Sequence, residues 1–551
     1  MKPAALVLVL VSVGCGKTET PPATAAPDAV VDAGTVADSG PTADAGSDGV
    51  GDPDVLDPEN GEGTFPPGFL WGTATAGFQV DMGCPTLPKA ECEDPNSDWY
   101  QFVMSDAMRK DSSNHLAGHD LSMSPGHWEL FEQDFDRAKN ELHNNGFRMS
   151  LEWSRIFPKP TDGAEGYEAL SKLANEAAVI HYHDVFEALK NRGIKPLVTL
   201  NHYTLPSWIH DGVACHLDLK TCKNKGWVDR ERTVKEIAKF AGFCAQEFGG
   251  EVDLWATENE PFAVLFPGYI FPSPDRVNPP AISALVDGGA SARIVFQALI
   301  EAHARMYDAI KAGDTADADA DGKAAVVGVV YSMAPVRPKD PTKEADKKAA
   351  ENVFYLWNMA FLNAVAKGIF DGDLDGKGEL RADLQGRMDY IGVNYYTRIG
   401  VEGADTAILP GLSPLTTFNP LTLEPWENYP KGIYEMVMKV KELGLPTIIT
   451  ENGTSATDDE GKVLVKWIVE NLTWLSRAIT DGAQVDGYFV WSLMDNYEWN
   501  HGMSMQFGLY GVDPKDPKKP RVARQAATVY GRIAKDGRIP KDLLDAYPVP
   551  D

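Results

Sequence analysis

The chain has 551 residues, of which 43% are hydrophobic and 10% aromatic, and this is the composition of a folded globular protein. Its formal charge of −29, without any basic stripe, argues against nucleic acid as a partner and disfavours anionic substrates. Several domains are not required, because a single barrel of strands and helices can use more than 400 residues.

The first fifteen residues have the features of an export signal. Lys2 precedes an apolar run from Ala4 to Val13, which is too short to span a bilayer as a mature helix. The run ends in Ser12-Val-Gly-Cys15, which resembles a bacterial lipobox, although Ser12 stands where an aliphatic residue is usual. We expect residues 1–15 to be a lipoprotein signal peptide, with Cys15 lipidated and the protein anchored outside the cytoplasm. An ordinary cleaved signal peptide is the alternative.

Residues 16–63 differ in composition from the rest of the chain. They contain eleven acidic residues, a single basic residue (Lys17) and no aromatic residue. Such a segment cannot bury enough apolar surface to offset the entropy lost on ordering, so we predict a disordered acidic linker. A flexible coil of this length spans roughly 40 Å, which suits a tether that holds a domain away from a membrane surface.

From residue 64 to residue 551, short β-rich runs alternate with amphipathic helical patterns such as Phe131–Leu142, Val185–Lys190 and Ala292–Ala309. The eight strand candidates are Phe69–Val80, Phe147–Trp153, Pro196–Asn201, Val252–Thr257, Ala325–Tyr331, Tyr390–Tyr395, Thr447–Thr450 and Gly487–Ser492. Eight strands that alternate with helices predict parallel βαβ units closed into one (β/α)8 barrel. We therefore expect an α/β fold with long βα loops and no second globular domain.

Five cysteines lie in the predicted folded part. Cys84 and Cys92 are close in sequence, as are Cys215 and Cys222, and each pair lies in a loop-like stretch. Outside the cytoplasm these pairs can oxidise to disulfides. Metal ligation is the alternative, although no histidine accompanies them at zinc spacing. Cys244 lies in a helical pattern and is expected to be a buried free thiol.

Polar and aromatic residues gather directly after the predicted strands, where the catalytic face of such a barrel lies. Glu260 follows the fourth predicted strand and Glu451 follows the seventh. These strands lie across the barrel from each other, so the two carboxylates can face one another over a substrate. A proton donor and a nucleophile about 5–5.5 Å apart perform double-displacement glycoside hydrolysis. The residues alone therefore predict a carbohydrate enzyme.

Six motifs follow one another in this part of the chain: Phe69-Leu-Trp-Gly-Thr-Ala-Thr-Ala-Gly-Phe-Gln79, Arg148 with Trp153-Ser-Arg155, Asn259-Glu260-Pro261, Asn394-Tyr-Tyr396, Thr450-Glu451-Asn-Gly453 and Asp495-Asn-Tyr-Glu498-Trp499. Together they resemble glycoside hydrolase family 1, which contains β-glucosidases, β-galactosidases and broad β-glycosidases. The run that begins at Tyr497 is similar to the archaeal branch in particular. The resemblance covers nearly everything after residue 64.

The resemblance implies Glu260 as general acid/base and Glu451 as nucleophile. Arg148 matches an arginine beside the nucleophile, where a fixed cation would keep Glu451 ionised. Asn394 and Tyr396 fall where the family positions the nucleophile and its neighbours. The implied contacts to the glycone, the sugar on the non-reducing side of the cleaved bond, are Gln79, His202, Asn259, Trp491, Glu498 and Trp499. The family needs no metal or organic cofactor.

The implied activity is that of a retaining exo-β-glycosidase on terminal non-reducing β-D-glucosyl residues, with galactosyl and fucosyl residues as further candidates. Small β-glycosides or short β-linked oligosaccharides would be its substrates. A 6-phospho-β-glycosidase is one alternative, disfavoured because Glu498 is kept where that branch lacks it. An inactive surface sugar-binding lipoprotein is the other, and it would require the loss of a catalytic carboxylate.

Two residues depart from the family pattern. Glu258 stands where an apolar or aromatic residue is usual, and Thr204 replaces a common aspartate. If the strand stays regular, Glu258 shares a face with Glu260 and holds a proton on it to higher pH. An irregular strand end that turns Glu258 away is the alternative. Glu152 and Arg155 are expected to form a structural ion pair.

One acidic loop has the opening of a calcium-binding loop. Asp371-Gly-Asp373-Leu-Asp375-Gly contains the alternating aspartates and the glycine of such a motif, but Ala382 stands at the position of the closing glutamate. A calcium site and a solvated acidic loop both remain open.

Overall fold

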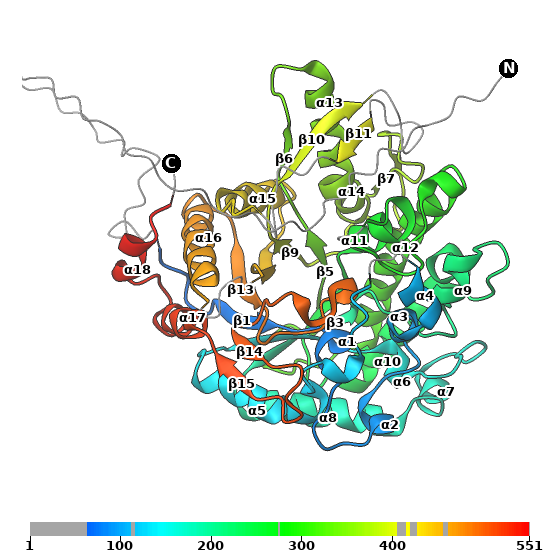
Figure 1. Ribbon diagram of the computed structural model, residues 1–551, viewed down its shortest axis with the longest axis horizontal. Helices are drawn as coiled ribbons and strands as arrows, with labels where there is room; N and C mark the ends of the chain where they lie inside the picture. Colours follow the sequence, from blue (N-terminus) through cyan, green and yellow to red (C-terminus); the bar gives the residue numbers. More distant parts are fainter. Residues whose placement is uncertain are drawn as a thin grey trace, which may run out of the picture. The chain divides into compact units, whose positions relative to one another are not determined.

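Eight parallel strands close into a barrel in the order β1-β13-β12-β9-β5-β4-β3-β2 (Figure 1). Their bounds are β1 (Leu70–Ala74), β2 (Gly146–Ser150), β3 (Lys195–Asn201), β4 (Leu254–Asn259), β5 (Val326–Ser332), β9 (Tyr390–Tyr395), β12 (Thr447–Asn452) and β13 (Val485–Trp491). The predicted (β/α)8 barrel is confirmed.

The computed structural model describes residues 63–549, apart from 112–115, 274–275, 405–414, 419–426 and 456–460. All of these residues belong to one compact unit, Asp54–Asp551. The predicted signal peptide with Cys15, and the predicted linker up to residue 62, lie outside the described residues. Within the described part of the chain, no helix combines the length and the apolar character needed to cross a membrane.

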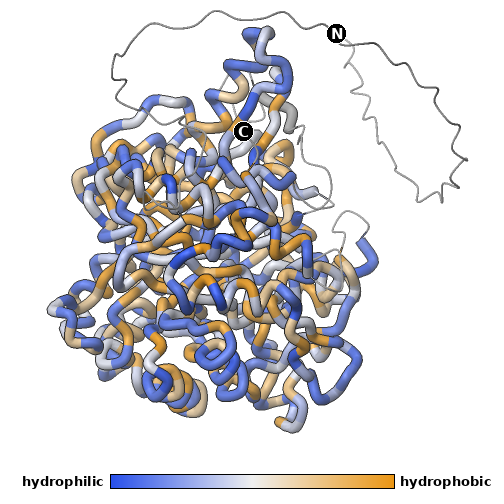
Figure 2. Tube along the Cα trace, turned by 90° about the vertical axis from the view of Figure 1, so that its left-hand side faces the viewer, coloured by the Kyte–Doolittle hydropathy of each residue, from blue (hydrophilic) through white to orange (hydrophobic). Residues whose placement is uncertain are grey.

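The long helices surround the barrel: α5 (His127–Asn140), α8 (Glu176–Asn191), α10 (Arg230–Phe248), α12 (Ala290–Gly313), α14 (Ala360–Lys367), α15 (Lys431–Lys441), α16 (Lys462–Thr480) and α17 (Gln525–Asp536). Hydrophilic and hydrophobic residues alternate along these helices (Figure 2). In α16, for example, Leu464, Ile468, Leu472 and Leu475 are all 0% exposed, and their spacing of three and four residues places them on one face. Burial of such faces against the strands stabilises the fold.

Apolar residues fill the barrel interior, and they form a cluster separate from the larger core of the protein. Leu197, Ala256, Val330, Ile448 and Phe489 come from five different strands and form one buried cluster. Their sequence neighbours on each strand point outward, because side chains alternate along a strand. The interior is therefore a packed core that supports a site at its carboxyl end.

The first predicted strand is only partly correct. The chain from Phe69 to Val80 was expected to be one strand, but β1 ends at Ala74 and the helical turn α1 (Gly77–Val80) follows. The amide of Gly77 donates to the hydroxyl of Ser150 at 2.8 Å. A side chain at the end of β2 thus satisfies a free amide of α1, and an apolar pattern alone does not reveal this contact.

The other helices are α2 (Lys89–Cys92), α3 (Asp98–Met104), α4 (Asp106–Lys110), α6 (Trp153–Ile156), α7 (Tyr167–Ser171), α9 (Gly212–Leu217), α11 (Pro261–Leu265), α13 (Glu344–Phe354) and α18 (Lys541–Ala546), and the segments of 3-10 or π helix are η2 (Leu121–Met123), η3 (Gly226–Val228), η4 (Phe266–Ile270), η5 (Ala284–Val286), η6 (Tyr355–Met359) and η7 (Trp499–Ser504). The remaining strands form three small sheets: β6 (Val336–Pro338) with β10 (Ile399–Ala404) and β11 (Leu415–Phe418), β7 (Ile369–Phe370) with β8 (Glu379–Leu380), and β14 (Tyr510–Val512) with β15 (Arg521–Ala523).

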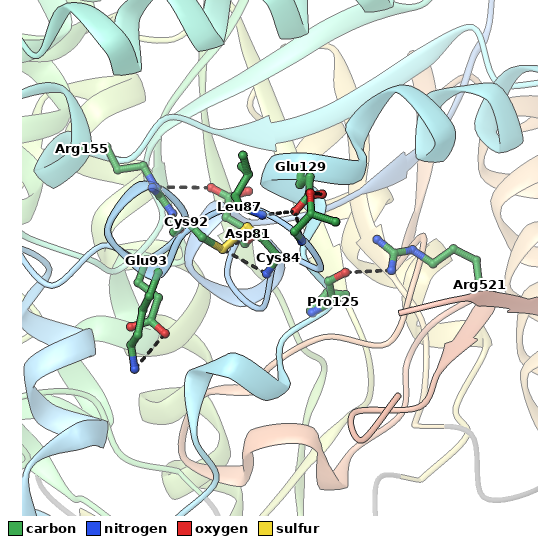
Figure 3. Close-up of a disulfide and its surroundings, with 11 residues drawn as sticks. Asp81, Cys84, Leu87, Cys92, Glu93, Pro125, Glu129, Arg155 and Arg521 are labelled. Atoms are coloured by element: carbon green, nitrogen blue, oxygen red, sulfur yellow. Dashed lines mark hydrogen bonds and ion pairs between the residues drawn. A yellow bond between two sulfur atoms is a disulfide. The ribbon is translucent and has the colours of Figure 1, made fainter. Parts of the chain in front are cut away.

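Both cysteine pairs form disulfides. Cys84 is bonded to Cys92, and Cys215 to Cys222, whereas Cys244 is a buried free thiol. Oxidation rather than metal ligation therefore accounts for the pairs. Arg155 donates from Nη2 to the carbonyl of Cys92 at 2.7 Å and attaches the first disulfide loop to the barrel (Figure 3).

Candidate active site

The two predicted catalytic carboxyl groups lie at the carboxyl end of the barrel. Glu260 directly follows β4, and Glu451 belongs to the end of β12. Two strands, β5 and β9, separate β4 from β12 around the barrel, and the charge of Glu260 acts on Glu451. Both residues are buried, with 3% and 4% of their surface exposed. The pair therefore lies together in a site from which most water is excluded.

Two donors hold the carboxyl group of Glu451. Oε1 accepts from Nη1 of Arg148 and Oε2 accepts from the hydroxyl of Tyr396, each at 2.5 Å. Burial raises the pKa of Glu451 to about 7, with Arg148 opposing this and the charge of Glu260 adding to it. The contact with Arg148 was expected, but burial outweighs its effect on the pKa. Arg148 is the cation that contacts Glu451, and it favours the ionised form of this carboxyl group.

A chain of amides connects Arg148 to Glu260. Nη2 of Arg148 donates to Oδ1 of Asn259 at 2.7 Å, and Nδ2 of Asn394 donates to the same oxygen at 3.1 Å. Nδ2 of Asn394 also donates to Oε1 of Glu260 at 2.9 Å. The hydroxyl of Thr450 donates to Oδ1 of Asn394 at 2.7 Å and fixes the orientation of that amide. The network brings together Arg148, Asn259 and Asn394, with Asn394 on Glu260 rather than on Glu451.

The other oxygen of Glu260 contacts a residue that the sequence did not single out. The hydroxyl of Tyr203 donates to Oε2 of Glu260 at 2.5 Å. Tyr203 comes two residues after β3, directly after the predicted glycone residue His202. In the sequence, only its position next to His202 suggested that Tyr203 is near the site. That position did not indicate a contact with Glu260.

Polar groups on one side of the carboxyl pair suit sugar hydroxyls. Nε2 of Gln79 donates to Glu498 and to Asn496, at 2.9 Å in both cases. Oε1 of Gln79 is buried and has no hydrogen-bond partner among the described residues. Burial raises the pKa of Glu498 to about 7, and the nearby Arg276 opposes this shift. Asn496 and Arg276 are further site residues that the sequence did not predict.

Aromatic rings lie beside these polar residues. The ring of His202 lies nearly parallel to those of Trp491 and Trp499, with centroids 6.1 and 5.9 Å away. Burial lowers the pKa of His202 well below its usual range, so the imidazole is neutral. Its Nδ1 is buried without a partner in the described part of the chain. Flat apolar faces with unsatisfied polar atoms between them are the features of a small-molecule pocket.

The arrangement can perform acid/base and nucleophilic chemistry on a polyhydroxylated ring. A comparison with known protein families identifies the class of enzyme. Residues 61–538 match the model of glycosyl hydrolase family 1. The chain belongs to this family. It is therefore a glycoside hydrolase of the β-glycosidase type.

Individual relatives agree with the family match. A β-galactosidase of Pyrococcus woesei is 34% identical over 87% of this chain and 98% of that protein. β-Glucosidase A of Thermotoga maritima is 28% identical over 86% of this chain and 98% of that protein. The solved β-glycosidase of Thermosphaera aggregans superposes with a TM-score of 0.75 at 30% identity, and the match covers 88% of this chain and 100% of that one. The predicted similarity to archaeal-type β-glycosidases is confirmed.

Glu258, which departs from the family 1 pattern, lies apart from the catalytic pair. The register between β4 and β5 shifts between Ala256 and Asn259, so side chains no longer alternate there. Glu258 is 0% exposed, and neither of its carboxyl oxygens has a hydrogen-bond partner within the described residues. Burial alone raises its pKa well above the usual range, without a contribution from Glu260. The structure favours the irregular strand end over the predicted coupling to the acid.

We expect Glu258→Leu to stabilise the protein increasingly as pH rises. The unfolded carboxyl ionises near pH 4.3 but the folded one only well above that, so the wild type loses about 1.4 kcal/mol per pH unit between the two values. Urea unfolding at pH 5 and pH 7 measures the difference in unfolding free energy between variant and wild type, which should be larger at pH 7. Glu258→Gln is the matched control and should show the same pH dependence without the added apolar surface. A difference that does not change with pH would contradict a neutral buried Glu258.

The predicted ion pair between Glu152 and Arg155 is wrong. Arg155 instead approaches Asp81, with 3.7 Å between Nε and Oδ2. Glu152 accepts from the hydroxyl of Thr204 at 2.7 Å and from that of Ser150 at 2.9 Å. The role of both residues is nevertheless structural, because these bonds join the connections that follow β1, β2 and β3. Thr204, the other departure from the family pattern, belongs to this support and makes no hydrogen bond to the carboxyl pair within the described residues.

The acidic loop after β7 brings its three aspartates close together. Carboxylate oxygens of Asp371, Asp373 and Asp375 lie within 4.8 Å of one another. Asp371 accepts from the hydroxyl of Tyr355 at 2.8 Å and from the amides of Asp375 and Gly376 at 3.0 and 2.8 Å. These donors account for the turn, and no metal is assigned to it.

Proposed function

We propose that the protein is a retaining exo-β-glycosidase that removes terminal non-reducing β-D-glucosyl residues, and galactosyl or fucosyl residues as further substrates. The observation that carries this proposal is the buried pair of Glu260 and Glu451, of which only Glu451 contacts Arg148. That asymmetry supports a nucleophile and a proton donor in fixed roles. Small β-glycosides or short β-linked oligosaccharides would fit such a site.

In the first step the ionised Glu451 attacks the anomeric carbon while Glu260 protonates the departing glycosidic oxygen. The carbon–oxygen bond breaks and a covalent glycosyl–enzyme forms. In the second step Glu260, now ionised, takes a proton from water, which attacks the anomeric carbon and releases Glu451. Two displacements return the sugar in its original β configuration.

The glycone would lie among Gln79, His202, Trp491, Glu498 and Trp499. Oε1 of Gln79 and Nδ1 of His202 are buried polar atoms without partners in the described residues, and such atoms are rare unless a ligand satisfies them. The Glu498 carboxyl would accept or donate to further hydroxyls. Asn259, which contacts Arg148, and Asn394, which contacts Glu260, border the anomeric carbon in this arrangement.

A panel of nitrophenyl β-glycosides with and without a 6-phosphate tests the substrate class. We expect turnover of the unphosphorylated β-glucoside and at least a 100-fold lower kcat/KM for its 6-phosphate, because Glu498 would repel the phosphate (about 2.7 kcal/mol). Preference for the phosphorylated sugars would establish the 6-phospho-β-glycosidase alternative. Sugar binding without turnover of any compound would establish the inactive binding lipoprotein.

We further propose that the enzyme works outside the cytoplasm, anchored only through a lipid on Cys15. The apolar run and the lipobox-like Ser12-Val-Gly-Cys15 support the anchor, and residues 16–63 would serve as its spacer. Two disulfides are consistent with an oxidising compartment.

The anchor predicts that the full-length protein partitions into the detergent phase and that Cys15→Ala moves it to the aqueous phase. Phase separation followed by mass spectrometry of the N-terminal peptide measures both the location and the modification. A wild-type protein that remains aqueous with an unmodified Cys15 would rule out the anchor, and a cleaved N-terminus elsewhere would establish an ordinary signal peptide.

A further inference from the structure

We propose that Tyr203 is a positioning residue for the general acid, in that its hydroxyl holds Oε2 of Glu260, the oxygen that carries the catalytic proton. The inference rests on the proposed role of Glu260 as acid/base. It starts from the 2.5 Å bond between the Tyr203 hydroxyl and this oxygen.

The two oxygens of Glu260 have different partners. Oε1 faces Nδ2 of Asn394, and an amide nitrogen only donates. That amide cannot turn over freely, because its Oδ1 accepts from Thr450 and its Nδ2 also donates to Asn259. Oε1 is therefore held as an acceptor, whether Glu260 is ionised or not.

Oε2 has the partner that allows a change of protonation. A tyrosine hydroxyl both donates and accepts, so it can donate to the ionised carboxylate and turn away or accept when Oε2 is protonated. The proton of the acid form is thereby assigned to Oε2. After this proton passes to the glycosidic oxygen, the Tyr203 hydroxyl donates to the carboxylate that is left, which stabilises charge where it develops.

The surroundings keep Tyr203 in this position as a neutral donor. Tyr203 is only 6% exposed, and its ring lies 4.7 Å from that of Trp499. Burial, together with the charge of Glu260, raises the pKa of Tyr203 well above its usual range. Its backbone has a φ of +70°, a conformation that a bulky residue rarely adopts without support from its neighbours. The packing thus fixes the hydroxyl against Glu260.

Tyr203→Phe tests the inference, since it removes only the hydroxyl. We expect kcat/KM to fall about tenfold or more for an alkyl β-glucoside but only a few-fold for a dinitrophenyl β-glucoside, whose leaving group needs no proton. The alkaline limb of kcat/KM should move up by about one pH unit, because the ionised carboxyl loses a stabilising bond. Tyr269→Phe, at a buried tyrosine whose hydroxyl has no partner in the described structure, is the matched control and should change neither quantity.

An equal loss for both substrates with an unmoved alkaline limb would overturn the inference and leave Tyr203 a purely structural role. Glu260→Ala, measured on the same substrates, separates this outcome from a failure of the proposed function. If Glu260→Ala shows the leaving-group dependence and Tyr203→Phe does not, only the inference fails; if neither shows it, the role of Glu260 fails. Tyr203→Met, which also lacks the hydroxyl, provides the same readout should the phenylalanine variant not fold.

Discussion

Glu451→Ala is expected to reduce turnover by about 10⁴-fold or more, because the substitution removes the group that forms the covalent intermediate. Arg148 and Tyr396, each 2.5 Å from the lost carboxylate, would remain with unsatisfied donors around the vacated space. A small anion in that space would accept hydrogen bonds from these donors and lie beside the positive charge of Arg148. We therefore expect azide to restore part of the activity and to form an α-configured glycosyl azide.

Rates with and without azide, and the configuration of the product by NMR, measure this outcome. Glu451→Gln is the matched control, since it removes the charge but fills the space, and azide should not restore its activity. Near-normal activity of Glu451→Ala, or a β-configured azide product, would show that another residue is the nucleophile.

The barrel was predictable because its signal is periodic and repeated. Strands such as Tyr390–Tyr395 are buried at every residue and apolar apart from Asn394, and the helices between them bury one face each. The error at β1 has a different origin. Its continuation, Gly77–Val80, is as apolar as a strand, but it becomes a helical turn because Ser150 and Glu152 satisfy its amides. These partners are more than 70 residues away in sequence, so no local pattern contains them.

The position of the two proposed catalytic carboxylates was predictable because the barrel fixes it. A residue at the end of a strand or directly after it reaches the carboxyl face, which places Glu451 and Glu260 at one end of the barrel. Tyr203 and Arg276 were not predictable in this way. Tyr203 lies in the connection after β3 and Arg276 in the stretch between η4 and η5, and spacing along the chain does not determine where side chains in such connections point.

Glu258 shows where a rule of local geometry fails. Alternation along a regular strand would place Glu258 on the face of Glu260, but the register shift at the end of β4 ends that alternation. Glu260 itself has a φ of +47°, so the strand is already irregular where the acid begins. A bulge next to an active site re-aims side chains, and here it separates two carboxyl groups that the sequence places two residues apart.

Glu260→Ala is expected to separate the two chemical roles that the site combines. The first displacement needs a proton only when the leaving group is basic, so kcat/KM should fall by about 10³-fold for an alkyl β-glucoside. For a dinitrophenyl β-glucoside, kcat/KM should fall by less than about tenfold, because its phenolate leaves without a proton. The value of kcat should fall for both substrates, since release of the sugar still requires a base.

Steady-state kinetics over a series of aryl and alkyl glucosides, plotted against leaving-group pKa, checks this separation through the slope of the line. Glu258→Ala is the matched control: it removes a buried carboxyl group two residues earlier, near the end of β4, whose pKa Glu260 does not influence, and it should leave the slope unchanged. Tyr203 and Asn394 remain in place in the Glu260 variant, so loss of their hydrogen bonds to the carboxyl is part of the measured effect. A slope in Glu260→Ala equal to that of the wild type would mean that a different group donates the proton.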